Sequence, residues 1–170
     1  MRTLSRATAP MLCLLALQAA SSAQAEIRVV QKIATVPLVA ASFDEAATQF
    51  DRQRATTFGT VQARFDASYT LRFFPGWCQV TGAVVEATVS GTLPQWTGEA
   101  SADAATRQRW GALTADPRER IAQMERDART AALEMDTLIQ GMPSKGDCDA
   151  VKAEVGRIVD QVKARHLGGR

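Results

Sequence analysis

Histidine and cysteine, the side chains that most often bind zinc, are scarce in this sequence. It holds one histidine, His166, and three cysteines. A Ser-His-Asp triad would need His166 near the chain end, and no serine stands in a Gly-x-Ser-x-Gly context. Glu134 and Asp136 are two residues apart, so on a helix their carboxylates do not face each other. The sequence therefore indicates none of the common hydrolase arrangements.

His166 is the one candidate metal ligand of the imidazole type. It follows Val162 by four residues, so it could equally complete the apolar face of a C-terminal helix. A metal site would need oxygen donors from residues such as Asp116, Glu119 and Glu125. Zinc sites usually combine several histidine or cysteine ligands, so we expect no metal site and no cofactor.

Residues 1–25 have the pattern of a secretory signal peptide. A start containing two arginines precedes the apolar run Met11–Ala20, and Ala23-Gln24-Ala25 has the small-x-small form of a cleavage site. The run is too short to cross a bilayer, which needs about 20 apolar residues. The mature chain is expected to begin at Glu26, to have no membrane span, and to be periplasmic or secreted.

Removal of this segment changes the charge balance. Two of the 20 basic residues, Arg2 and Arg6, lie in it, so 18 basic and 18 acidic residues remain. Both signs are interspersed and no basic stripe is present. Nucleic acid is therefore not expected as a partner.

Two cysteines, Cys78 and Cys148, remain once Cys13 leaves with the signal peptide. An even pair in an exported protein predicts a disulfide. Free or metal-bound thiols are the alternative. They fit less well because the pair is far apart in sequence and lacks Cys-x-x-Cys spacing.

Alternation of apolar and polar residues predicts strands in the first half of the chain. A short strand, Ile27–Ile33, should end at Val36-Pro37-Leu38, and longer strands over 61–73 and 79–93 should be joined by a turn at Pro75-Gly76. One face of the last strand is apolar and the other mostly polar. This pattern predicts an antiparallel sheet of about three to five strands that is covered on one side.

Helical spacing follows, with one short helix after Ser42 and three later helices. The later ones are expected from a cap at Ser101 to about Leu113, over Asp116–Gln140, and from about Asp147 to His166. Strands first and helices after predict a single α+β domain over 26–170, with the three helices packed on one face of the sheet.

The longest helix, Asp116–Gln140, organises the second half. Asp116 is expected to be its N-cap, with Asp116-x-x-Glu119 as a capping box. Its apolar stripe comprises Ile121, Met124, Ala128, Ala131, Met135 and Leu138.

Several short stretches occur in a characteristic order. They are Tyr69-Thr70-Leu71-Arg72-Phe73, Cys78-Gln79-Val80, Leu93-Pro94-Gln95-Trp96, Arg109-Trp110 and a late Cys148. In this order, between Phe65 and Val162, the sequence resembles the bacterial DUF922 family, exported proteins described as predicted zinc-dependent proteases.

In that family the long helix carries His-Glu-x-x-His. Two histidines on one helical face hold zinc, and the glutamate polarises the attacking water. The matching window here is Arg118-Glu119-Arg120-Ile121-Ala122, which keeps only Glu119. The resemblance therefore implies a degenerate metalloprotease, with Glu119 either a relic of the base or a structural residue. Zinc is expected for the family but not for this sequence.

The three tryptophans, Trp77, Trp96 and Trp110, could form a binding surface, but large aromatics are more often core residues. Three functions stay open. The first is a non-catalytic interaction or structural module of the cell envelope, with an unidentified protein or envelope partner. The others are a zinc-dependent peptidase, as the family label implies, and a small-ligand binder with an aromatic cleft between sheet and helices. We expect the first, because metal-assisted hydrolysis needs ligands where Arg118 and Ala122 stand.

Overall fold

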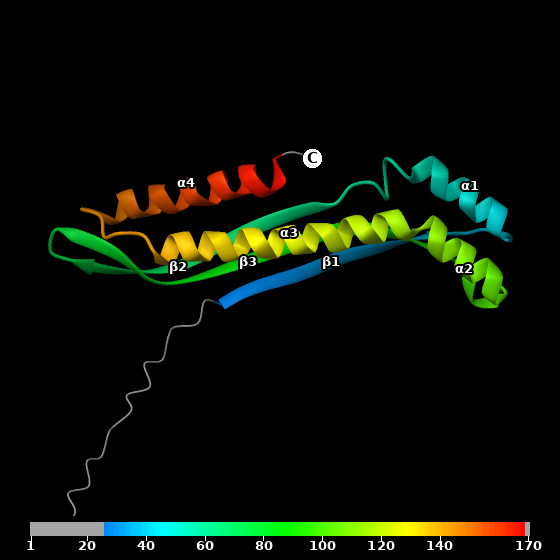
Figure 1. Ribbon diagram of the computed structural model, residues 1–170, viewed down its shortest axis with the longest axis horizontal. Helices are drawn as coiled ribbons and strands as arrows, with labels where there is room; N and C mark the ends of the chain where they lie inside the picture. The colour runs from blue at the N-terminus through cyan, green and yellow to red at the C-terminus, as the bar shows by residue number, and fades with distance from the viewer. Residues whose placement is uncertain (1–25, 169–170) are drawn as a thin grey trace, which may run out of the picture.

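A computed structural model describes residues 26–168 as an elongated α+β structure, which confirms the predicted fold class (Figure 1). Its strands are β1 Glu26–Leu38, β2 Gln62–Phe74 and β3 Trp77–Trp96. Its helices are α1 Phe43–Gln53, the 3-10 helix η1 Glu99–Ser101, α2 Ala104–Leu113, α3 Ala115–Gln140 and α4 Cys148–Leu167. The predicted signal peptide lies outside the described residues. Within residues 26–168, no helix has the length and apolar character needed to span a membrane.

The described strands form one sheet in the order β1-β3-β2. β2 and β3 make an antiparallel hairpin, whereas β1 runs parallel to β3 from the Glu26–Val84 pair to the Leu38–Trp96 pair. The sheet is therefore mixed, and the prediction of an antiparallel sheet was wrong. Residue alternation reports which faces of a strand are buried, but it does not report the direction of the neighbouring strand.

β1 also continues through Pro37, where the sequence predicted a break. Pro37 lies opposite Gln95 in the parallel register, and β1 is an edge strand. Proline cannot donate to a ladder, but an edge strand tolerates it because one side of the strand needs no partner.

The β2–β3 hairpin turns at Pro75-Gly76, as predicted. Gly76 has a φ of 83°, a value that glycine adopts without strain and that type II turns require after proline. The register shifts between Thr70 and Leu71, where Thr70 pairs with Gly82 and Leu71 with Val80. The outer part of the hairpin is thus offset by a bulge from the rest of the sheet.

Helices α3 and α4 cover one face of the sheet (Figure 1). Val85, Ala87 and Val89 alternate along β3 and are buried in one hydrophobic cluster with residues of both helices. The predicted stripe of α3 is buried from Ile121 to Met135, but Leu138 is 41% exposed. Ile139 is buried in its place, because four-residue steps from Met135 bring position 139 back to the sheet.

A second hydrophobic cluster lies at the end of the molecule opposite the hairpin, around α1, α2 and the ends of β1 and β3 (Figure 1). Trp110 of α2 is fully buried there, with its ring centroid 6.2 Å from Phe50 and 6.0 Å from Trp96. The prediction that all three later helices pack on one sheet face was therefore wrong for α2. Helix α2 packs against α1 and β3 instead, because the large ring of Trp110 is buried against Phe50 and Trp96.

Polar side chains fix most helix starts. Ser42 and Asp147 cap α1 and α4 as expected. Helix α2 begins later than predicted, because Asp103 accepts the backbone N–H of Thr106 at 2.7 Å, while Ser101 closes η1.

Candidate functional site

The window that corresponds to His-Glu-x-x-His lies in the first half of α3. Arg118 and Glu119 are exposed and Ala122 is half-buried. The Nη1 of Arg118 donates to the carbonyl oxygen of Gly111 at 3.4 Å, so its guanidinium reaches back to α2. Arg118 and Ala122 are four residues apart and share one face of the helix.

Glu125 continues that face, seven residues after Arg118. Its Oε2 accepts a hydrogen bond from Nε2 of Gln31 at 2.6 Å, and its Oε1 lies 3.7 Å from the guanidinium of Arg129. The face therefore looks toward the edge strand β1. Sequence reasoning missed Gln31, because its position beside α3 depends on the parallel pairing of β1.

The capping box predicted at the start of α3 is absent. The N-cap position of α3 is Thr114, two residues before the predicted Asp116, and it has no side-chain cap bond. Asp116 lies within the first turn, where a carboxylate favours the helix dipole. It pairs with Arg120 at 3.0 Å and with Arg54 at 3.6 Å. Glu119 therefore has no capping role.

His166 lies far from Glu119. Its Nε2 is 2.6 Å from Oε2 of Glu134, which also pairs with Arg165. Glu134 follows Glu119 by about four turns of α3, or roughly 22 Å along the helix axis. The oxygen donors considered with His166 were Asp116, Glu119 and Glu125. His166 instead pairs with Glu134, whereas Glu125 pairs with Gln31 and Arg129. Among residues 26–168, no three His, Cys, Asp or Glu side chains are grouped so that they could hold a metal ion.

The three tryptophans separate into two environments. Trp96 and Trp110 are buried in the second hydrophobic cluster, where Nε1 of Trp96 donates to the carbonyl of Ala40 at 3.0 Å. Trp77 is only half-buried and stacks on Phe74 at the hairpin, far from that cluster. The three rings therefore form no common cleft between sheet and helices.

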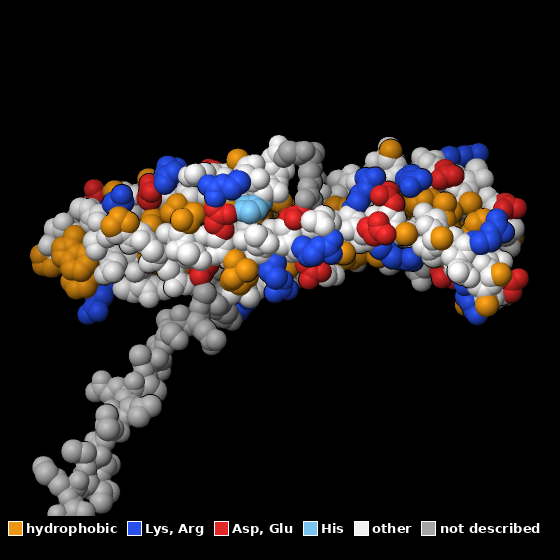
Figure 2. All heavy atoms as spheres, viewed as in Figure 1, with side chains coloured by type: hydrophobic (Ala, Val, Ile, Leu, Met, Phe, Trp, Pro, Cys, Tyr) orange, Lys and Arg blue, Asp and Glu red, His pale blue; other side chains and the backbone are white. Residues whose placement is uncertain are grey.

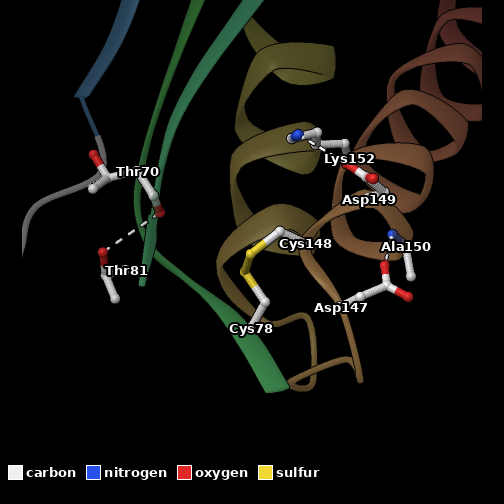
Figure 3. Close-up of a disulfide and its surroundings, with 8 residues drawn as sticks. All are labelled: Thr70, Cys78, Thr81, Asp147, Cys148, Asp149, Ala150 and Lys152. Atoms are coloured by element: carbon white, nitrogen blue, oxygen red, sulfur yellow. Dashed lines mark hydrogen bonds and ion pairs between the residues drawn. A yellow bond between two sulfur atoms is a disulfide. The ribbon is translucent and has the colours of Figure 1, made fainter. Parts of the chain in front are cut away.

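The predicted disulfide between Cys78 and Cys148 is present (Figure 3). It joins the start of β3 to the first residue of α4. Backbone hydrogen bonds between Cys78 and Lys145, at 2.7 and 2.9 Å, attach the preceding loop to the same strand. This end of the molecule is thus cross-linked in two ways.

An open hollow of about 440 Å³ lies beside the window, between the start of β2 and α3. Its lining consists of Gly59, Thr60, Val61, Arg120, Gln123 and Met124. The residues are neutral apart from Arg120, whose guanidinium donates to the carbonyl of Gly59 at 3.4 Å and pairs with Asp116. The hollow offers a cation and an amide to a ligand but no general base.

A scan against family models matches residues 32–168 to "Bacterial protein of unknown function (DUF922)". The chain belongs to the DUF922 family. No curated protein and no solved structure matches it significantly. The DUF922 match begins within β1 and ends just after α4, so it includes the α3 window and both cysteines of the disulfide. The resemblance drawn from the ordered stretches is therefore confirmed, whereas the catalytic state of the window stays a prediction.

Proposed function

We propose that this DUF922 protein is an exported, non-catalytic interaction module of the cell envelope. The observation that carries the proposal is the pair of side chains four residues apart on α3, Arg118 and Ala122. A guanidinium stays protonated and offers no lone pair to a metal, and alanine has no ligand atom. A catalytic zinc needs three protein ligands and one open position.

The surroundings of the pair also favour a structural role for this face. Glu125, the nearest carboxylate along it, is held by Gln31 and Arg129. The cations Arg118 and Arg129 at either end would raise the energy of a bound dication. A face that carries an ion pair and a bond to β1 serves to attach α3 to the sheet edge.

Export is supported by the sequence pattern of residues 1–25 and by the disulfide, which persists in oxidising compartments. We expect the protein recovered from the cell envelope or medium to have an intact mass that begins at Glu26 and lacks two cysteine hydrogens. A cytosolic protein of full mass with three alkylatable thiols would contradict export.

The catalytic question is tested by metal analysis of untagged protein, followed by a peptidase assay with added zinc. We expect no stoichiometric zinc and no cleavage that chelators abolish. Stoichiometric zinc, together with chelator-sensitive cleavage that is lost in Glu119→Gln, would establish the zinc-dependent peptidase instead.

A gain-of-ligand variant checks the assignment of the window. Arg118→His with Ala122→His places two imidazoles on the face that already holds Glu125. We expect the double variant to bind zinc more tightly than the parent and than the matched single variant Arg118→His, because the single variant supplies only one of the two helical ligands. Equal zinc affinity in all three proteins would argue against this register.

A further inference from the structure

The β2–β3 hairpin ends in an aromatic tip, formed by residues 73–77, Phe-Phe-Pro-Gly-Trp. Phe73 is 72% exposed, which is unusual for a phenylalanine. The tip lies at one extreme of the long axis, beyond the end of the helical layer (Figure 1). Figure 2 shows hydrophobic side chains gathered at this end of the molecule, with a basic group beside them.

Aromatic rings occupy both faces of the tip. Phe74 and Trp77 are cross-strand partners and stack with ring centroids 3.7 Å apart and 8° between their planes. Phe73 pairs with Cys78, so it belongs to the face of the sheet that α3 and α4 cover elsewhere. Among residues 26–168 no helix covers Phe73, because α4 begins only at Cys148, the disulfide partner of Cys78.

The tip cannot fold back to cover these rings. Directly behind it, Cys78 is bonded to Cys148 (Figure 3). The backbone of Cys78 also makes two hydrogen bonds to Lys145. The turn itself is set by Pro75 and by the positive φ of Gly76. The aromatic rings are therefore presented to solvent by a cross-linked support.

The outer part of the hairpin, which carries the tip, has charge of one sign only. Residues 67–85 contain no aspartate or glutamate and one charged residue, Arg72. The guanidinium carbon of Arg72 lies 5.0 Å from the ring centroid of Phe74. The acidic residues at the start of α4 each have a partner within that helix. Asp149 pairs with Lys152, and Asp147 accepts the backbone N–H of Ala150 as the N-cap (Figure 3).

We propose that the aromatic tip inserts into the interfacial region of a phospholipid bilayer, with Arg72 placed at the phosphate level. Phenylalanine and tryptophan are the side chains that membrane interfaces favour, and a basic residue gains from anionic headgroups. The rings project from the apex of a hairpin on both faces, a shape that enters a fluid interface more readily than a matching protein groove. The proposal goes beyond the interaction module described above and is independent of whether the α3 window binds zinc.

Trp77 reports its own insertion, because Trp96 and Trp110 are only 5% and 0% exposed. The exported protein, which is expected to begin at Glu26, is mixed with vesicles of equal parts phosphatidylcholine and phosphatidylglycerol, some carrying brominated acyl chains. We expect the emission of Trp77 to shift to the blue and to be quenched by the brominated chains. The same experiment on Trp77→Phe should lose the quenched component.

Vesicle affinity is then compared in matched variants that share the same N-terminal segment. Phe73→Ser should lower the partition coefficient by about tenfold. Transfer of a phenyl ring from water to an apolar environment is favourable by at least the free energy that corresponds to this change. Arg72→Gln should weaken binding to these vesicles and leave binding to pure phosphatidylcholine unchanged. Val39→Ser is the control, because Val39 is 73% exposed at the opposite end of the molecule.

Two results would overturn the proposal. One is an unquenched Trp77 in vesicles that sediment with the protein, which would assign binding to another segment. The other is a vesicle affinity of Phe73→Ser equal to that of Val39→Ser. In either case the exposed rings would instead fit a protein partner.

Discussion

Removing the disulfide is expected to lower the free energy of unfolding by about 4 kcal/mol. The bond closes a loop of 70 residues, and the chain-entropy estimate for a loop of that length is about 4 kcal/mol at 25 °C. The perturbation is Cys78→Ala together with Cys148→Ala. Alanine is preferred to serine because Cys78 is fully buried, and a hydroxyl there would need a hydrogen-bond partner.

The variant should still fold, since the bond is not the only attachment at this end. The two backbone hydrogen bonds between Cys78 and Lys145 do not depend on sulfur. Helix α4 also stays packed in the hydrophobic cluster between the sheet and the helices, through Val151, Val155 and Ile158. The loss should therefore arise mainly in the unfolded chain, which gains freedom when the loop opens.

Guanidinium unfolding of wild type and variant, each with and without reductant, measures the effect. Wild type should lose about 4 kcal/mol in reductant and converge on the variant, while the variant should be insensitive to reductant. The midpoint temperature should fall by roughly 10–15 °C for a chain of this size. A difference below about 1 kcal/mol, or an equal effect of reductant on both proteins, would refute the loop-closure reasoning.

Two further predictions concern local contacts. Gly98→Ala should cost about 1–3 kcal/mol by overpacking, because its Cβ would lie 2.8 Å from Nε1 of the buried Trp96. The control is Gly111→Ala within α2, where an added Cβ meets nothing within 4 Å, and it should be neutral or stabilising. Equal losses of stability for the two variants in thermal unfolding would contradict this prediction. The backbone N–H of Thr106 lowers the pKa of Asp103 below its ordinary value of 3.8, so this group stabilises the fold above about pH 4 and the contribution is lost as pH falls through the lowered pKa. Asp103→Asn keeps the cap but cannot titrate, so urea unfolding should show a smaller loss of stability from pH 7 to pH 3 than wild type, and equal losses would exclude the linkage.

Local patterns predicted much of the fold. The hairpin turn at Pro75-Gly76, the buried stripe of α3 up to Met135 and the cap of α4 at Asp147 follow from rules that involve neighbours in sequence. The parallel direction of β1 does not follow from such rules, because the residues of β1 do not indicate which strand will lie beside it. The contact between Gln31 and Glu125 was not predicted for the same reason, since it depends on where β1 lies in the sheet.

The candidate site was predicted as a set of residue types but not as a geometry. The loss of both histidines from the window is plain in the sequence. The separation of His166 from Glu119 is not, because it depends on how far α4 runs back along α3 before meeting Glu134. The N-cap of α3 was predicted two residues late because Asp116 and Pro117 are strong start signals, yet the helix begins at Ala115.

The presence of two hydrophobic clusters also affects how the molecule opens. The disulfide lies in the cluster beneath α3 and α4. Its loop, residues 78–148, includes Trp96 and Trp110 of the second cluster but leaves out α1. Helix α1 is joined to the rest through Phe50, which contacts Phe58 and Trp110, and through Phe43, which contacts Trp96 and Arg109. Its amide protons should therefore exchange with solvent through partial opening, whereas those of β3 should exchange only through global unfolding. Helix α1, which lies outside the disulfide loop, is thus expected to open before the rest of the fold.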